Sequence, residues 1–164
     1  MTVDGIKEFL GKDWTDTEGL VRSSLSSDLD LLQATNAAIL DAGGKRLRPL
    51  LALLAARACS GGKTTFDSIR FAAAVELLHN ATLLHDDVAD CSSQRRGKPT
   101  VNSILGGTAS VLIGDFWLTK ALDIILSSRE HGNEVIGIFS KTLSDLAQGE
   151  ILQLQKAASC DTTE

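Results

Sequence analysis

Three aspartates lie close together near the middle of the chain: Asp86, Asp87 and Asp90. The residues before them are apolar at helical spacing, so we expect a helix that carries Asp86 and Asp90 on one face. Like charges at this spacing cost a helix about 0.2–0.5 kcal/mol, and carboxylates near its C-terminus oppose the helix dipole by a further ~0.3–1 kcal/mol. Local stability therefore does not favour the cluster, whereas carboxylate oxygens suit a hard divalent cation such as Mg²⁺.

Basic residues flank the aspartates on both sides. Arg95 and Arg96 follow them, and Lys45 lies upstream with Arg48 three residues later. Guanidinium groups bind phosphate oxygens through two hydrogen bonds, and a lysine supplies a compact positive charge. Acids that bind a metal, next to cations that bind phosphate, predict a site for a diphosphate. Taken without these cations, the aspartates have a solvated helix end as their less favoured alternative.

The elements that must position these groups are predicted to be helices. Capping patterns at residues 15–18 and 27–30 predict helices that begin near residues 16 and 28. Apolar patterns and stop signals predict further helices over residues 50–58, 66–91, 108–127 and 134–158, a short turn over 100–105 and a polar loop over 92–99. Residues 161–164 form one more capping pattern, with no helix after it. Because alternating strand patterns are missing, we expect an all-α fold of packed antiparallel helices.

Composition narrows the class of protein. A chain of 164 residues with 43% hydrophobic residues fits one globular domain, and the formal net charge of −5 gives no reason to expect a nucleic acid as partner. Cys59, Cys91 and Cys160 are far apart and lack zinc-ligand spacing, which favours free thiols and a cytoplasmic protein. No signal peptide is expected, and no transmembrane segment, because no uncharged apolar run approaches the roughly 18–20 residues that span a bilayer.

Four segments, in this order, resemble the trans-isoprenyl diphosphate synthase (polyprenyl synthetase) family. They are Gly-Gly-Lys-Arg-Leu-Arg-Pro at 43–49, Glu-Leu-Leu-His-Asn-Ala-Thr-Leu-Leu-His-Asp-Asp-Val-Ala-Asp at 76–90, Arg-Arg-Gly-Lys-Pro-Thr at 95–100 and Gly-Asp-Phe at 114–116. The resemblance implies the all-helical bundle of the isoprenoid synthases, around a central cavity. It also implies Mg²⁺ as cofactor, a homodimer, and head-to-tail condensation of isopentenyl diphosphate with an allylic diphosphate.

The resemblance also implies roles for single residues. Asp86 and Asp90 would hold Mg²⁺ on the allylic diphosphate with support from Asp87, and Arg95 would contact the same diphosphate. The residues that would contact isopentenyl diphosphate are Lys45, Arg48, His79 and Arg96. Without the resemblance, His79 would be interpreted as a partly buried helix histidine.

Product length is predicted from Ala81 and Thr82, which lie one turn before the aspartates. In the family that the chain resembles, aromatic residues here block elongation. Two small side chains therefore predict a product longer than farnesyl, of medium to long chain. The alternative is that both are ordinary core residues.

The chain departs from the family pattern after Asp90. The family's second aspartate-rich motif is missing, since the later aspartates are isolated from one another. We therefore expect residues 1–164 to be the N-terminal half of a single domain, truncated and inactive alone. One alternative is a noncatalytic binding or regulatory subunit of a heteromeric synthase. The other, a terpene cyclase, is disfavoured by Lys45, Arg48 and Arg96, because a cyclase has no second diphosphate to hold.

Overall fold

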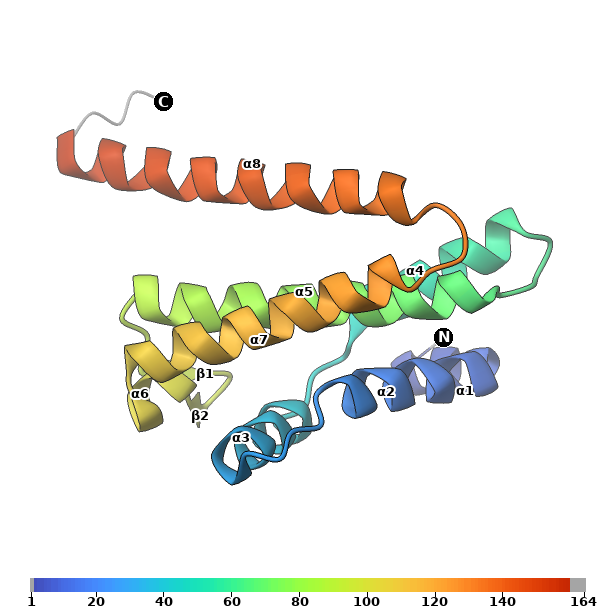
Figure 1. Ribbon diagram of the computed structural model, residues 1–164, viewed down its shortest axis with the longest axis horizontal. Helices are drawn as coiled ribbons and strands as arrows, with labels where there is room; N and C mark the ends of the chain where they lie inside the picture. Colours follow the sequence, from blue (N-terminus) through green and yellow to red (C-terminus); the bar gives the residue numbers. More distant parts are fainter. Residues whose placement is uncertain (1, 160–164) are drawn as a thin grey trace. The chain divides into compact units, whose positions relative to one another are not determined.

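The computed structural model describes residues 2–159. The chain divides into two compact units, and the boundary in the sequence follows Ser128. The first unit contains seven helices and one hairpin among its described residues (Figure 1). Its helices are α1 (Val3–Leu10), α2 (Lys12–Ser24), α3 (Asp30–Asp41), α4 (Leu47–Cys59), α5 (Phe66–Ala89), α6 (Val101–Leu105) and α7 (Gly107–Leu126). The second unit contains α8 (Gly132–Ser159). The expected all-helical fold is confirmed.

The long helix α5 is the centre of the first unit. Thr65 and Ser68 form a capping box: each side-chain oxygen accepts from the other residue's backbone N–H, at 3.1 and 3.2 Å. Small and branched apolar side chains along α5 are fully buried, including Ala72, Ala73 and Leu77. The helix packs against α2, α4 and α7. The expected helix over 66–91 is confirmed, except that it ends at Ala89.

Helix α7 approaches α5 closely at Gly114. A Cβ atom there would lie 2.4 Å from the Nε2 atom of His85, so only a glycine leaves room for this ring. The His85 Nε2 atom lies 3.3 Å from the carbonyl oxygen of Val111 and 3.2 Å from a carboxylate oxygen of Asp115. His85 therefore belongs to the contact between α5 and α7.

A buried polar bridge joins α3 to α7. The indole N–H of Trp117 donates to the Oδ1 atom of Asn36 at 2.8 Å, and the Nδ2 atom of Asn36 donates to the carbonyl oxygen of Leu25 at 2.9 Å. Trp117 is fully buried. Because both polar groups of Asn36 have partners, the bridge satisfies its buried amide and fixes one point of α3.

The N-terminal helices differ from the sequence prediction. Helix α2 begins at Lys12, not near residue 16, and the hydroxyls of Thr15 and Thr17 donate to carbonyl oxygens one turn back instead of capping. Helix α3 begins at Asp30, two residues after the expected start. Helices α1, α2 and α4 meet around a core of Leu10, Trp14, Leu50 and Leu53.

The expected loop over 92–99 contains a small hairpin. Strand β1 (Gln94–Arg95) pairs antiparallel with β2 (Lys98–Pro99). Arg96 and Gly97 form the two-residue turn, both at positive φ (52° and 76°), as a type I′ turn requires. The sequence predicted a polar loop over 92–99 and did not predict this hairpin.

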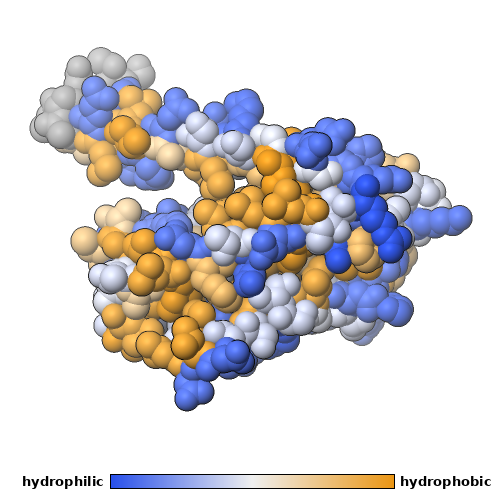
Figure 2. All heavy atoms as spheres, viewed as in Figure 1, coloured by the Kyte–Doolittle hydropathy of each residue, from blue (hydrophilic) through white to orange (hydrophobic). Residues whose placement is uncertain are grey.

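The surfaces of both units keep apolar side chains. In the first unit, Ile104 of α6 and Leu112 of α7 are exposed, and hydrophobic surface covers the α6 end of this unit in the view of Figure 2. In the second unit, Ile151 and Leu154 of α8 are exposed. None of the helices in the described range is long and apolar enough to cross a membrane.

Two further expectations concern the cysteines and the C-terminus. Cys59 and Cys91 are free and exposed, as predicted. Cys160 and the capping pattern at 161–164 lie outside the described residues.

Candidate functional site

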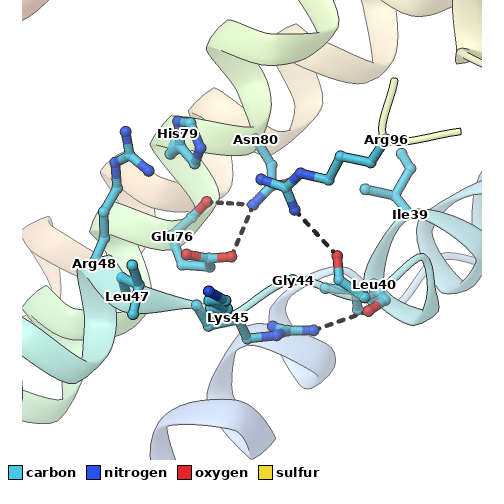
Figure 3. Close-up of a pocket in the computed structure, with 12 residues that line it drawn as sticks. Ile39, Leu40, Gly44, Lys45, Leu47, Arg48, Glu76, His79, Asn80 and Arg96 are labelled. Carbon is cyan, nitrogen blue, oxygen red and sulfur yellow. Dashed lines mark hydrogen bonds between the residues drawn. The ribbon is translucent and has the colours of Figure 1, made fainter. Parts of the chain in front are cut away.

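A cavity of about 390 Å³ lies between the C-terminal end of α3, the loop before α4, one face of α5 and the hairpin (Figure 3). We call it the cationic pocket. The four residues that the sequence placed on isopentenyl diphosphate all line it: Lys45, Arg48, His79 and Arg96. They come from three separate segments of the chain, so the fold brings together groups that are up to 51 positions apart in the sequence.

The loop from residue 43 to 46 gives the pocket its shape. Gly43 and Gly44 have φ of 83° and 155°, and Arg46 has φ of 47°. A side chain at Gly44 would meet Arg96, because a Cβ atom there would lie 2.7 Å from its Nη1 atom. The glycines therefore allow both the turn and the close approach of the hairpin.

Arg46 lies in the same loop and is held by contacts within the protein. Its side chain is only 13% exposed, and its Nε atom lies 3.5 Å from Glu18 of α2. Its Nη2 atom donates to the carbonyl oxygen of Leu40 at 3.0 Å. Arg46 thus ties the loop to the end of α3, while Lys45 and Arg48 are exposed on either side of it.

Arg96 lies at the turn of the hairpin and reaches the opposite side of the pocket. Its Nη1 atom donates to the carbonyl oxygen of Gly43 at 3.3 Å (Figure 3). This contact joins the hairpin to the loop before α4. A positive charge is therefore held at the mouth of the pocket by a single, weak hydrogen bond to the backbone.

Glu76 and Asn80 are functional candidates that the sequence analysis missed. Both line the pocket, and the Nδ2 atom of Asn80 donates to the Glu76 carboxylate at 3.2 Å and to its carbonyl oxygen at 2.8 Å (Figure 3). Glu76 is 8% exposed. The signal that could have found them is helical spacing, since they lie three residues before and one residue after His79 on α5.

His79 is neutral in the empty pocket at pH 7. Burial lowers the pKa of its imidazole, and the positive charges of Arg48, Arg96 and Arg95 lower it further, to about 4. The imidazole therefore offers hydrogen bonds to a bound anion but does not begin as a cation.

Asp87 faces away from the other two aspartates and is buried. Its Oδ1 atom accepts a hydrogen bond from the Nε atom of Arg95 at 2.9 Å, and the Nη2 atom of Arg95 lies 2.9 Å from the same oxygen in an ion pair. Its backbone carbonyl accepts from Asn102 at 3.0 Å and from the N–H of Ser92 at 2.9 Å. Asp87 therefore fixes the hairpin to the end of α5, and the guanidinium of Arg95 lies on this carboxylate.

Asp86 and Asp90 lie one turn apart at the end of α5, as predicted. The backbone N–H of Asp90 donates to the carbonyl oxygen of Asp86 at 2.8 Å. In the described part of the chain, no group of three or more His, Cys, Asp or Glu side chains is arranged to hold a metal ion. Two carboxylates still fit Mg²⁺, because this ion is usually bound by one or two carboxylates together with substrate phosphates and water.

Ala81 and Thr82 do not line the cationic pocket. Ala81 is buried, and the hydroxyl of partly buried Thr82 donates to the carbonyl oxygen of His79 at 2.9 Å. Their influence on product length stays a prediction.

The sequence and the fold are similar to those of known proteins. The polyprenyl synthetase family model matches residues 29–164. The octaprenyl diphosphate synthase of Escherichia coli strain K12 is 39% identical over 164 residues, which are 100% of this chain and 50% of that protein. The all-trans-nonaprenyl-diphosphate synthase of Rhodobacter capsulatus is 37% identical, again over 100% of this chain and 50% of the relative.

A solved structure of a decaprenyl diphosphate synthase from Rhodobacter capsulatus matches with a TM-score of 0.87 and 37% identity, covering 99% of this chain and 49% of that one. A polyprenyl synthase from Caulobacter crescentus, solved with calcium and isoprenyl diphosphate, matches with a TM-score of 0.83 and 37% identity, over 94% of this chain and 46% of that one. The chain thus spans about half the length of these relatives. It belongs to the polyprenyl synthetase family.

Proposed function

We propose that the chain is the N-terminal part of a prenyltransferase, a polyprenyl diphosphate synthase. The enzyme would condense isopentenyl diphosphate head-to-tail with an allylic diphosphate and form an all-trans polyprenyl diphosphate. The observation that carries this proposal is the cationic pocket, in which Lys45, Arg48, His79 and Arg96 meet. Matched relatives are named as octaprenyl and nonaprenyl diphosphate synthases, which supports the choice of reaction.

In this proposal the two diphosphates bind at different places. The isopentenyl diphosphate occupies the cationic pocket, where Lys45, Arg48 and Arg96 offset its charge and neutral His79 adds a hydrogen bond. The allylic diphosphate lies at the end of α5, held through Mg²⁺ by Asp86 and Asp90. Arg95 reaches it by leaving Asp87 or by using the N–H groups that Asp87 does not occupy.

The chemistry requires these residue types. The allylic carbon–oxygen bond breaks as negative charge grows on the leaving diphosphate, and bound Mg²⁺ would stabilise that charge. The side chains of this protein orient the isopentenyl double bond toward the allylic carbon. They need no nucleophile of their own, because the double bond supplies the electrons of the new carbon–carbon bond. The cation formed by this attack then loses a proton, which the released diphosphate accepts, and a new double bond forms.

Medium to long products are proposed from Ala81 and Thr82, because neither residue one turn before the aspartates is a bulky aromatic that would block elongation. A Thr82→Phe substitution in a complete enzyme should shorten the products, as measured by chromatography of the dephosphorylated prenols. An unchanged distribution of chain lengths would remove Thr82 from this role.

The test of the reaction itself is an incorporation assay. The chain is incubated with Mg²⁺, radiolabelled isopentenyl diphosphate and an allylic primer, first alone and then with a full-length relative. Because the chain carries only one aspartate-rich motif, we expect no turnover alone. Turnover of the chain alone would contradict the proposal that it is incomplete. A rise above the activity of the full-length partner would favour a noncatalytic subunit of a heteromeric enzyme.

Assembly is proposed from the family resemblance, which favours a homodimer. Sedimentation of the chain at several concentrations measures its mass directly. A monomer at all concentrations would contradict a dimer built by this half of the protein.

A further inference from the structure

A second cavity of about 550 Å³ lies on the other side of Arg96. It is an open cavity lined by α3, α5, the hairpin and α6, and its size falls within the range of about 300–1,000 Å³ that is typical of small-molecule sites. We call it the apolar pocket. It shares four lining residues with the cationic pocket, so the two cavities adjoin: Ile39, Gly43, Asn80 and Arg96. Asp86 and Asp90 line neither cavity.

The interior of the apolar pocket offers almost only hydrocarbon. Alkyl side chains from three helices form its walls, among them Ala38, Leu83 and Ile104. Polar side chains in the lining already have partners: the hydroxyl of Thr100 donates to Ser92, and Asn80 donates to Glu76. A polar ligand body would lose its hydrogen bonds with water and find few in return. The interior therefore fits a hydrocarbon chain.

The edge of the same pocket is positively charged. Arg95 and Asp87 neutralise each other through their ion pair. The positive charges of the other two basic lining residues, Arg96 and Lys98, are not neutralised in this way. Neither of these two residues forms an ion pair with another described side chain. An anionic head group at this edge would therefore meet two uncompensated cations.

We propose that the apolar pocket binds an amphiphile with one hydrocarbon chain and a phosphate or diphosphate head, without a metal ion. The chain lies between α3, α5 and α6, and the head lies on Arg96 and Lys98. Prenyl phosphates are the members of this class that the proposed function would make available, although the site itself does not depend on that function. Because Arg96 lines both cavities, a bound amphiphile would also weaken anion binding in the cationic pocket.

The test is calorimetric titration of the chain with farnesyl monophosphate, below its aggregation concentration and in EDTA. An Ala38→Phe variant fills the pocket from α3, where residue 38 is exposed, and should weaken binding at least tenfold. The matched control is Ala55→Phe on α4, also exposed and outside both cavities, which should change the affinity less than twofold. Far-UV circular dichroism verifies folding, and Ala34→Phe replaces Ala38→Phe if that variant is unfolded.

The head group is tested separately. Farnesol, which lacks the phosphate, should bind at least tenfold more weakly than farnesyl monophosphate. A Lys98→Gln substitution should weaken farnesyl monophosphate about fivefold, whereas Lys63→Gln, an exposed lysine far from the pocket in the sequence, should not. Farnesol binding as tightly as the phosphate would overturn the assigned head site.

Two other results would overturn the proposal. Binding that requires Mg²⁺ and disappears in Asp86→Asn would place the amphiphile at the end of α5. Binding in EDTA that is unchanged by both pocket-filling variants would place it elsewhere on the chain. The proposed prenyl transfer can fail in its own assay while metal-free binding persists, so the two proposals fail independently.

Discussion

The cationic pocket and the aspartate end of α5 are built in different ways. The pocket takes its side chains from a loop, a helix and a hairpin, and tertiary contacts such as Arg96 to Gly43 and Arg46 to Leu40 hold them together. The aspartate end consists of neighbours along one helix. Within the described residues, no third acid or histidine joins Asp86 and Asp90 as a metal ligand.

This difference separates two kinds of binding. A pocket that is assembled by the fold can accept a diphosphate without help from a metal. A pair of carboxylates repels a diphosphate unless a cation lies between them. We therefore expect isopentenyl diphosphate to bind in EDTA and an allylic diphosphate to bind only with Mg²⁺.

The largest effect is expected at the aspartates. Asp86→Asn combined with Asp90→Asn should weaken metal-dependent binding of farnesyl thiodiphosphate at least 100-fold, because both charged metal ligands are lost. Isopentenyl diphosphate in EDTA should bind the same variant within twofold of the wild type. Calorimetry measures both, with Asp28→Asn, an exposed acid outside the site, as the control. Equal losses for both ligands would mean that the two sites are one.

The converse test removes a positive charge from the cationic pocket and leaves the aspartates unchanged. Arg96→Ala should weaken isopentenyl diphosphate in EDTA about 10- to 100-fold, since hydrogen bonds to charged groups contribute about 1.5–3 kcal/mol. Arg22→Ala removes an exposed arginine that pairs with Asp41 outside the pocket, and it should leave this affinity unchanged. A loss confined to the allylic analogue would show that the two diphosphate sites had been exchanged.

Asp87 is expected to affect stability more than ligand binding. Asp87→Asn leaves Arg95 without its counter-charge, and because Arg95 is partly exposed the cost should be only about 1–2 kcal/mol. Urea denaturation measures the free energy of unfolding. Asp123→Asn, which disrupts an exposed pair with Lys120, should cost less than about 0.5 kcal/mol. Equal costs in the two variants would contradict a structural role for Asp87.

Local signals explain which parts of the fold could be predicted. Helix α5 was found because its cap at Thr65 and its apolar side chains are neighbours in the sequence. The pattern at 15–18 gave a wrong helix start. A threonine hydroxyl can cap a helix, but inside a helix it can also donate a hydrogen bond to a carbonyl oxygen one turn earlier. The hairpin was missed because its strands are two residues long and only Gly97 in its turn favours positive φ.

In the candidate site too, local sequence signals could be recognised, whereas contacts between distant residues could not. Residue types and spacing identified the cations and the aspartates, but they could not show how the fold would connect them. The contacts of Arg46 could not be predicted, because its partners, Glu18 and Leu40, lie outside its own segment. Asp87 was expected only to support its neighbours, whereas its contact with Arg95 depends on the hairpin that the sequence did not reveal.

The smallest expected effect is the pH dependence of the cationic pocket. Burial and nearby arginines hold the pKa of His79 at about 4, below the ordinary value of 6.5 that it regains on unfolding. Between these values the unfolded chain binds more protons than the folded one, so the free energy of unfolding should fall as the pH decreases from 6.5 toward 4. His79→Gln should flatten this part of the curve, measured by urea denaturation at several pH values. His131→Gln, which changes an exposed histidine, should not.

A diphosphate bound in the cationic pocket should offset the positive charges that lower the pKa of His79. Its negative charge offsets the fields of Arg48 and Arg96, so the pKa of His79 should rise on binding and the protein should take up protons below pH 6. Calorimetry in two buffers with different ionisation enthalpies measures this uptake. Arg95, which is proposed to contact the allylic diphosphate, contributes less to the shift of the His79 pKa than Arg48 and Arg96 do, so metal-dependent binding of the allylic analogue should show only a smaller uptake that His79→Gln removes. If His79→Gln abolished proton uptake for both ligands equally, the pocket and the aspartate end would have to be treated as one electrostatic site.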